Sequence, residues 1–338
     1  MSMNHNQEIR LASRPVGMPT RENFAFVDVD LPVAHDGQVL LKTMYVSVDP
    51  YMRGRMNDVK SYVPPFQLDK AMEGDVIAEV VESRHSQYAK GDIVAGQLPW
   101  RLYTTSDGHG LRKLNAEHGP VTAALSVLGI TGLTAYFGLF EIGQPKPGET
   151  VVVSGAAGAV GSVVGQIAKL CGCRVVGIAG SDEKASYLTD ELGFDAAINY
   201  RTQNVSQALK EVCPQGVDVY FDNVGGDVTD AVLMRINDRA RIAMCGQIAL
   251  YNATKAEMGP RLLAQLVVHR ALMQGFIVSD YATRFPEAIK RLAAWLASGK
   301  IKYRETVVEG FDRVPEAFLG LFRGDNTGKQ LVKVAQSE

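Results

Sequence analysis

The chain has 338 residues, a formal net charge of −2 at pH 7 and 21% charged residues. This length is enough for about two domains, each with a hydrophobic core of its own. The near-neutral balance offers no basic surface for a nucleic acid and no polybasic cluster for a membrane surface. We therefore expect a small molecule as the ligand.

Neither a targeting segment nor a metal-binding cysteine pattern stands out. The first fifteen residues, MSMNHNQEIRLASRP, lack the apolar segment of a secretory signal, so we expect a cytoplasmic protein. The four cysteines, Cys171, Cys173, Cys213 and Cys245, form no CxxC pair and lack the Cys/His spacing of a zinc site. We expect Cys171 and Cys173 to be buried thiols in a reducing compartment.

The first part of the chain predicts a β-rich domain. Residues 24–105 contain the apolar segments NFAFVDVD, GQVLLKTMYVSVD, GDVIAEVVES and GDIVAG, separated by turn residues. This pattern is typical of short strands, and we expect a small, barrel-like domain. The next segment, VTAALSVLGITGLTAYFGLFEIG, is apolar on most faces and predicts one or two buried helices.

From residue 149 onward, apolar strands alternate with helical patterns. The predicted strands are TVVVSG, CRVVGIAG, DAAINY, VDVYFDNVGG, ARIAMCGQ and MQGFIVSD. Six such strands with helices between them predict a parallel sheet covered on both faces, as in a doubly wound dinucleotide fold. Residues 301–334 return to strand, helix and strand. Composition leaves open whether this tail completes the first domain or stands alone.

Residues 150–168, TVVVSGAAGAVGSVVGQIA, run without a charge for nineteen residues, about the length of a membrane span. Glycines at positions 155, 158, 161 and 165 could pack helices in a membrane. The run VVVSGAAG instead indicates a strand, a tight turn and a helix. Glycines in such a turn let backbone amides approach a pyrophosphate at the helix N-terminus. The spacing, Gly-x-x-Gly-x-x-Gly, is weak alone, but in this context it predicts a dinucleotide site.

The end of the next strand favours NADP(H) over NAD(H). NAD-specific folds carry an acid about 20 residues downstream for the ribose hydroxyls, whereas GIAGSDEK places Gly180 and Ser181 there. Ser181 and Lys184 can accept a 2′-phosphate that an acid would repel. Lys184 can also be an ordinary exposed helix lysine. Tyr200 is a candidate to cover the adenosine end or, equally, a surface tyrosine.

Segments spread over almost the whole chain carry a family resemblance. They are RLASRPVGMPTRENF, SVDPYMRGRM, LGITGLTAYFGLFEIGQPKPGE, GAVGSVVGQIAKL, VVGIAGSDEK, YFDNVGG, CGQIALYN, GFIV and EAFLGLFRGDNTGK. Together they resemble the medium-chain dehydrogenase/reductase family, in its zinc-independent branch of prostaglandin and curcumin reductases. The segment GRMNDVKSYVPP looks closer to the bacterial curcumin reductases.

The resemblance implies an α/β fold, a cofactor and an assembly. A GroES-like β-barrel catalytic domain, residues 1–125 and 296–338, is expected beside a doubly wound parallel-sheet Rossmann domain, residues 126–295. A homodimer that binds NADPH is expected by the same analogy. The implied cofactor contacts are Gly158, Ala159, Val160 and Gly161 in the phosphate loop, Ser181, Lys184 and Tyr200 at the 2′-phosphate, and Thr134, Asn223, Cys245, Gly246, Tyr251, Phe276, Ile277, Val278 and Asn326 elsewhere.

The residues that hold catalytic zinc in zinc-dependent members of this family are missing here. Those relatives carry a histidine in a Gly-His-Glu-Gly motif, whereas AMEGDVIAEVV has Met72 in that position, and no cysteine precedes Cys171. A thioether and a carboxylate make a poor zinc site, so we expect no metal and place Met72 in a core or pocket lining. Without a Lewis acid, conjugate reduction is favoured: a hydride goes to the β-carbon, and hydrogen-bond donors stabilise the enolate.

Two tyrosines are the candidate donors. Tyr51, in SVDPYMRGR, follows a strand and a proline turn, and Tyr251 follows the fifth strand, at the edge where such sheets bind ligands. Tyr251 can instead hold the nicotinamide ribose. Tyr62 is a candidate for the substrate entrance or, equally, a loop tyrosine without a function. Arg53 is a candidate to bind a substrate carboxylate, although arginines that follow a turn are usually solvated. We expect an NADPH-dependent reductase of the C=C bond of an α,β-unsaturated ketone or aldehyde; a quinone reductase and a non-catalytic NADP(H) sensor are the alternatives.

Overall fold

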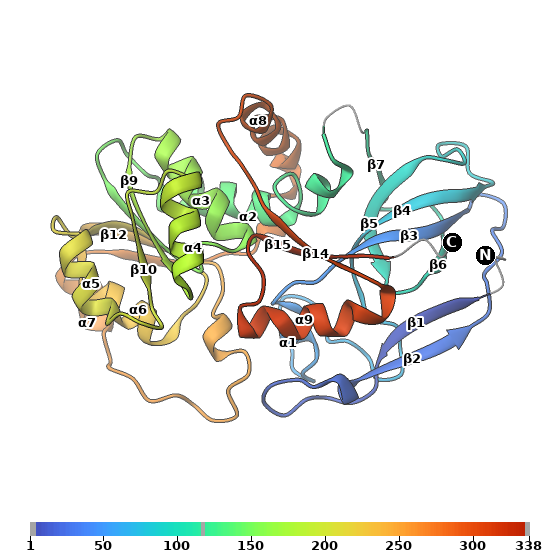
Figure 1. The fold of residues 1–338 in the computed structure, drawn as a ribbon, viewed down its shortest axis with the longest axis horizontal. Helices are drawn as coiled ribbons and strands as arrows, with labels where there is room; N and C mark the ends of the chain where they lie inside the picture. The colour runs from blue at the N-terminus through green and yellow to red at the C-terminus, as the bar shows by residue number, and fades with distance from the viewer. Residues whose placement is uncertain (1–4, 116–118, 335–338) are drawn as a thin grey trace. The chain divides into compact units, whose positions relative to one another are not determined.

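The computed structural model describes residues 5–115 and 119–334. The chain divides into two compact units (Figure 1). Unit 1 consists of Met1–Leu125, Glu305–Asn326 and Gln330–Glu338. Unit 2 consists of Ser126–Arg304 and Thr327–Lys329.

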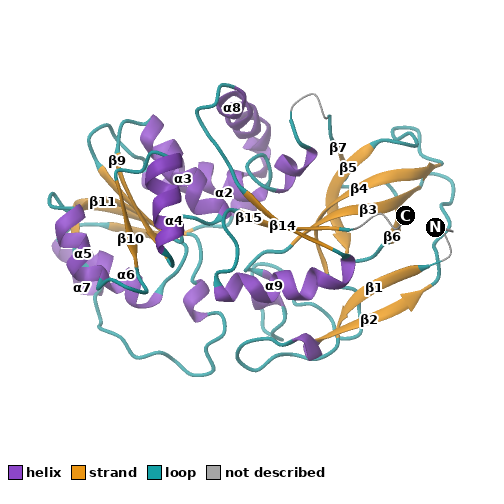
Figure 2. Ribbon diagram, viewed as in Figure 1, coloured by secondary structure: helices purple, strands orange, loops and turns teal. Residues whose placement is uncertain are grey.

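Unit 1 is built mainly from β-strands (Figure 2). Its strands are β1 (Asn6–Leu11), β2 (Phe24–Val29), β3 (Val39–Ser47), β4 (Glu73–Ser83), β5 (Ile93–Pro99), β6 (Tyr103–Ser106), β7 (Arg112–Lys113), β14 (Glu305–Glu309) and β15 (Lys329–Lys333). Its helices are α1 (Met52–Arg55), α9 (Val314–Arg323) and the 3-10 helices η1 (Arg21–Asn23), η3 (Val121–Leu125) and η8 (Phe311–Arg313). One sheet has the order β14-β15-β3-β4-β5-β7 with β6 also paired to β3, and β1 pairs with β2 separately.

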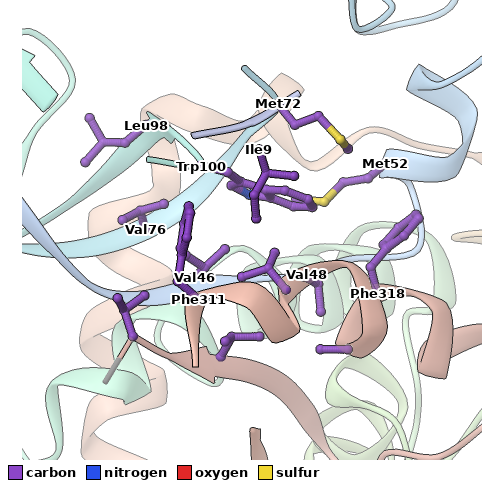
Figure 3. Packing of buried hydrophobic residues seen from close by; sticks show 14 of the residues in the cluster. Ile9, Val46, Val48, Met52, Met72, Val76, Leu98, Trp100, Phe311 and Phe318 are labelled. Carbon is purple, nitrogen blue, oxygen red and sulfur yellow. The ribbon is translucent and has the colours of Figure 1, made fainter. Parts of the chain in front are cut away.

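The core of unit 1 joins the sheet to the C-terminal helix. Alternate residues of β4 enter this core, and α9 buries Val314, Ala317, Phe318 and Leu321, the i, i+3, i+4, i+7 pattern of an amphipathic helix. The tail therefore completes the first domain, as the resemblance implied. Met72 is fully buried in the same core, near Met52 and Trp100 (Figure 3).

Unit 2 contains a six-stranded parallel sheet with helices between its strands. Its strands are β8 (Thr150–Ser154), β9 (Arg174–Ala179), β10 (Ala196–Asn199), β11 (Val217–Asp222), β12 (Ile236–Met244) and β13 (Leu272–Gly275). Its helices are α2 (Ile130–Phe137), α3 (Ala159–Leu170), α4 (Asp182–Ser186), α5 (Val205–Val212), α6 (Gly226–Leu233), α7 (Leu263–Val268) and α8 (Phe285–Ala297), the π-helices η4 (Gly138–Gly143) and η5 (Tyr187–Glu191), and the 3-10 helices η6 (Ile248–Leu250) and η7 (Val278–Arg284).

The strand order identifies the topology of unit 2. The order is β10-β9-β8-β11-β12-β13. Numbered along the chain, this is the 3-2-1-4-5-6 order of a doubly wound dinucleotide fold. The uncharged stretch from residue 150 is a strand, a turn and a helix, as predicted. Within the described ranges, no helix combines the length and the apolar character that crossing a bilayer requires.

Two predicted boundaries differ from the structure. The predicted strand MQGFIVSD ends at Gly275, because the Phe276 ring turns onto Phe221 and a 3-10 helix starts at Val278. The predicted return to the first domain at residue 296 falls inside α8, and unit 2 continues to Arg304. The chain stays with unit 2 there because Gln166 of α3 exchanges hydrogen bonds with the backbone of Lys302, at 2.8 Å each.

Candidate functional site

The turn between β8 and α3 presents backbone amides at a helix N-terminus. Gly155 has a φ of 56°, in the left-handed region, and Gly158 is the N-cap residue of α3. A Cβ on Gly161 would lie 2.5 Å from the Gly155 carbonyl oxygen, so only glycine lets the helix approach the turn this closely. The first amides of a helix have no intrahelical acceptor, and Ala159, Val160 and Gly161 supply them here. This geometry suits a pyrophosphate.

Gly328, a residue that sequence reasoning missed, lies in the last sequence segment of unit 2 and contacts this turn. The Gly328 amide donates to the Ala157 carbonyl at 2.7 Å, and Gly328 forms a parallel bridge with Gly158. Gly328 has a φ of 70°, and a Cβ there would lie 1.9 Å from the Arg304 carbonyl oxygen. The glycine-rich run GDNTG is the only sequence signal for it. Asn326, the predicted cofactor contact in this run, is the last residue of the Glu305–Asn326 segment and belongs to unit 1.

The turn between β9 and α4 brings together the residues predicted for the 2′-phosphate. Ser181 caps α4, with its hydroxyl accepting from the Lys184 amide at 3.2 Å. A Cβ on Gly180 would lie 2.9 Å from the Tyr200 hydroxyl, so the Tyr200 ring covers this glycine, and 44% of that tyrosine is exposed. The Lys184 side chain is partly exposed in the first turn of the helix.

Asp182, a carboxylate that sequence reasoning did not weigh, follows this turn directly as the first residue of α4. Its Oδ1 accepts from the Asn199 Nδ2 at 2.7 Å. Asn199 ends β10, the strand that pairs with β9. The side chain of Asp182 is therefore tied to the neighbouring strand, while Gly180 and Ser181 hold the position that NAD-specific folds give to an acid.

The segments after β11 and β12 lie against the start of the phosphate turn. The Asn223 Nδ2 donates to the Ser154 carbonyl at 2.7 Å, and the amides of Cys245 and Gly246 donate to the Asp222 carbonyl. Burial, with the Asp222 charge as a lesser cause, raises the pKa of the Cys245 thiol to about 12. This thiol is therefore neutral at physiological pH and a poor nucleophile.

Both predicted tyrosine donors are neutral phenols in their own units. Tyr251 follows η6, and its hydroxyl accepts from the Gln247 amide at 3.4 Å beside Gly246. Burial raises its pKa above the ordinary value, and the Gln247 amide offsets this in part. Tyr51 precedes α1, and burial, followed by the charges of Asp49 and Asp75, raises its pKa well above the ordinary value. Each hydroxyl keeps its proton and can donate it.

The predicted contacts near the expected nicotinamide divide between side chain and backbone. The Thr134 hydroxyl donates to the Ile130 carbonyl within α2 at 2.7 Å, and keeps acceptor capacity. The Phe276 ring packs on Phe221 and fills the space that a Cβ on Gly138 would need. Phe276, Ile277 and Val278 can therefore meet a ligand through their backbone, and Ile277 and Val278 are partly exposed.

The two predicted substrate contacts fare differently. Arg53 is only 3% exposed, and its guanidinium donates to the Gly17 carbonyl at 2.9 Å and to the Asn57 side chain at 2.7 Å. These hydrogen bonds connect α1 to the segment around Gly17. They indicate a structural role for Arg53 in place of the predicted binding of a substrate carboxylate. Tyr62 lies in the loop after α1 and is 62% exposed, as an entrance residue would be.

The described part of the chain contains no group of three or more His, Cys, Asp or Glu side chains that could hold a metal ion. Met72, in the position of the zinc-ligating histidine, lies in the core of unit 1. The absence of a metal stays a prediction from the sequence.

The chain is similar to known oxidoreductases. Residues 7–114 match the family model described as the N-terminal domain of oxidoreductase, and residues 159–294 match the model described as zinc-binding dehydrogenase. A putative NADP-dependent oxidoreductase of Bacillus subtilis is 59% identical, over 97% of this chain and 98% of its own. The NADPH-dependent curcumin reductase of Escherichia coli is 45% identical, over 98% and 97% respectively.

Two further relatives place the chain more narrowly. Rat prostaglandin reductase 1 is 46% identical, over 94% of this chain and 95% of its own. The crystal structure of CurA from Vibrio vulnificus in complex with NADPH superposes with a TM-score of 0.94 at 47% identity, covering 98% of this chain and all of that one. The chain thus belongs to the medium-chain dehydrogenase/reductase family of oxidoreductases, in the branch of the curcumin and prostaglandin reductases.

Proposed function

We propose that this protein is an NADPH-dependent reductase of the C=C bond of α,β-unsaturated ketones and aldehydes. The observation that carries the cofactor choice is the turn after β9, where Gly180 and Ser181 replace the expected acid beside Lys184 and Tyr200. The named activities of the NADPH-dependent curcumin reductase and of prostaglandin reductase 1 support the same assignment.

The residues of unit 2 fit this cofactor. The first amides of α3 would hold the pyrophosphate, and Ser181, Lys184 and Tyr200 would hold the 2′-phosphate. Asn223 and the segments from Cys245 and from Phe276 follow strands whose carboxyl ends share one edge of the sheet, where such folds bind their ligand. When bound, NADPH supplies the hydride.

The chain's own contribution to the reaction is hydrogen bonding and proton delivery. We assign Tyr51 and Tyr251 as donors to the carbonyl oxygen of the substrate, where negative charge develops as the β-carbon is reduced. Both phenols keep their protons at physiological pH because burial raises their pKa values. A neutral donor stabilises the enolate, and the α-carbon is then protonated by Tyr251, Tyr51 or water. Tyr251 can serve the nicotinamide ribose as well.

Product analysis tests the reaction. The purified protein is mixed with NADPH and a simple enone, and the product is identified by mass spectrometry and NMR. A saturated ketone is expected, with the same rate in the presence of a chelator. An allylic alcohol, reduced at C=O with C=C intact, would refute the proposal. Faster turnover of a quinone measured in parallel would favour a quinone reductase, and tight NADPH binding without turnover of either class would favour a sensor.

We also propose a homodimer, and the exposed edge of the unit 2 sheet supports it. β13 is the outer strand, and the adjoining apolar side chains of Leu263, Val267, Val268 and Leu272 are 45–78% exposed. An edge strand beside exposed apolar residues favours pairing with a second copy. Light scattering should give twice the chain mass, and a chain mass at micromolar concentration would argue against the dimer.

A further inference from the structure

Asp222, the last residue of β11, is a fully buried carboxylate. It lies where the strands of the unit 2 sheet end, at the carboxyl edge that we propose binds the cofactor. In the part of the chain that the structure describes, its side chain makes no ion pair with a lysine, arginine or histidine. Burying a charge without a cationic partner is costly unless hydrogen-bond donors surround it. The donors around Asp222 therefore indicate what this residue does.

Five donors converge on this carboxylate. Oδ1 accepts from the hydroxyls of Ser154 and Tyr220 at 3.0 and 2.9 Å and from the amides of Val224 and Gly225 at 2.9 and 3.0 Å, and Oδ2 accepts from the Thr229 hydroxyl at 2.6 Å. Charge-assisted hydrogen bonds of this kind are about twice as strong as neutral ones. The carboxylate thus fixes each donor in place.

The side-chain bonds of Asp222 join two segments of unit 2, and its backbone carbonyl reaches a third. Ser154 ends β8, directly before the phosphate turn, and Gly225 lies in the turn between β11 and α6. The backbone carbonyl of Asp222 accepts from the amides of Cys245 and Gly246, at 2.8 and 3.1 Å, which open the segment after β12. Each of the three segments carries residues that we assign to the cofactor.

A relay of hydrogen bonds orients Asn223. The Ser154 hydroxyl donates to Asp222 and accepts from the Asn223 amide at 2.9 Å, while the Asn223 side chain donates to the Ser154 carbonyl at 2.7 Å. Without the carboxylate, the Ser154 hydroxyl loses its acceptor, and the relay loses the charge that directs it.

We propose that Asp222 is a positioning residue for the cofactor, which holds the phosphate turn, the Asn223 turn and the Cys245 segment in one binding-competent arrangement. The proposal rests on the proposed function, because those segments are assigned to NADPH there. Asp222 itself need not touch the cofactor: it acts through Ser154, Asn223 and the backbone of Cys245.

The opposite end of the same strand offers a matched control. Asp218, near the start of β11, accepts from the Thr150 amide and from the Asn237 side chain, both at 2.8 Å. Asp218 and Asp222 therefore bridge the same two strands, but Asp218 does so at the amino end, away from the carboxyl edge assigned to the cofactor. Loss of either carboxylate weakens the sheet, while only Asp222 is expected to affect binding.

The test compares Asp222→Asn with Asp218→Asn. NADPH and NADH dissociation constants are measured by fluorescence titration, and Tm is measured by calorimetry. We expect both variants to melt earlier than the wild type. Asp222→Asn should raise both dissociation constants at least fivefold with their ratio unchanged, because the side chain holds the ends of β8 and β11, which lie apart from the residues assigned to the 2′-phosphate. Asp218→Asn should bind like the wild type. A purely structural Asp222 would lower Tm and leave the affinity of the folded protein intact.

Two outcomes overturn the proposal while the proposed function stands, provided that the wild type binds NADPH and reduces enones. In the first, the dissociation constant of Asp222→Asn for NADPH is within twofold of the wild-type value. In the second, Asp218→Asn loses as much affinity for NADPH as Asp222→Asn. A wild type that does not bind NADPH overturns both. If Asp222→Asn fails to fold, Ser154→Ala decides, since it removes the relay and leaves four donors on the carboxylate. A threefold or greater rise in its dissociation constant supports the proposal, and wild-type affinity refutes it.

Discussion

At the residue scale, Lys184 is the sharpest test of cofactor choice. The Lys184→Ala variant should raise the KM for NADPH about tenfold or more, because a charged hydrogen bond to the 2′-phosphate contributes about 1.5–3 kcal/mol. The KM for NADH should hardly change, since NADH has no 2′-phosphate. Steady-state kinetics with both cofactors measures the effect. Lys169→Ala is the control, because that lysine pairs with Asp195. Equal changes in both KM values would contradict the phosphate role.

The two tyrosine hydroxyls make a separate residue-scale prediction. Tyr251→Phe and Tyr51→Phe should each lower kcat for an enone by about 10-fold to 1,000-fold, because each removes a donor to the developing oxyanion. The dissociation constant for NADPH should change little for Tyr51→Phe. Tyr88→Phe, which removes a hydroxyl bound to the Leu111 carbonyl at 3.0 Å, serves as the control. Wild-type kcat in both phenylalanine variants would remove these hydroxyls from the reaction.

The roles of residues were predictable where a local motif fixes the backbone. They were hard to predict where a side chain hydrogen-bonds to a residue far away in the sequence. Ser181 is in the expected turn because the strand, glycine and capping residue define it. Arg53 was assigned to the substrate, yet it turns toward a carbonyl 36 residues away in sequence. Asp222 stands in the quoted segment YFDNVGG, but a carboxylate held by hydroxyls and amides has no spacing pattern to find.

At the scale of elements, Gly161 controls how closely α3 approaches the phosphate turn. In Gly161→Ala, the new Cβ would meet the Gly155 carbonyl oxygen at 2.5 Å, which is backbone and cannot swing away. We expect a loss of about 1–3 kcal/mol in the free energy of unfolding and weaker NADPH binding, because the amides of the first turn move. Denaturant unfolding and fluorescence titration measure the two effects.

Gly54→Ala provides the matched control for this helix glycine. A Cβ there meets nothing within 4 Å, and Gly54 lies in α1 of the other unit. Removing a glycine where alanine fits should leave stability unchanged or raise it by about 0.4–1 kcal/mol. Wild-type stability in Gly161→Ala would show that the turn can yield, and would weaken the close-approach argument.

The elements of unit 2 were predictable because periodicity and glycine turns agree along the chain. The six strands and the helix that starts in the glycine turn follow from that agreement, whereas the strand order comes from the structure. Finer features did not follow. The helix that begins after Ser181 passes into a π-helix at Tyr187, and the segment before β13 forms only the short α7, none of whose residues is buried. Packing against neighbours sets such details, and a single sequence does not encode them locally.

At the scale of the whole molecule, both units have carboxylates that favour the folded state at neutral pH. In unit 1, burial by itself raises the pKa of Glu8, but hydrogen bonds from Arg10 and Arg101 outweigh it and leave this pKa lowered. In unit 2, the pKa of Glu149 is lowered by Arg241 in the same way, against the opposing effect of burial. Arginine partners thus stabilise the ionised form of a carboxylate in each unit.

Acid should therefore destabilise the fold in a window set by these groups. The unfolded state, with glutamate pKa values of about 4.3, takes up protons first as the pH falls. The stabilising contribution is complete above that value and is lost as the pH passes through the lowered folded pKa. Thermal melting from pH 7 to pH 3 should show Tm falling below about pH 4.5.

Glu8→Gln tests how much of this acid sensitivity comes from one buried carboxylate. The variant should melt earlier at pH 7, because Arg10 and Arg101 lose their charged partner, and its Tm should fall less between pH 7 and pH 3 than the wild type's. Asp36→Asn is the control, because that carboxylate is fully exposed and its ion pair with Arg84 is long and weak, at 4.0 Å. If Glu8→Gln and the wild type show the same fall in Tm on acidification, other carboxylates set the acid limit, and the ion pairs of Glu8 with Arg10 and Arg101 only hold β1 in place.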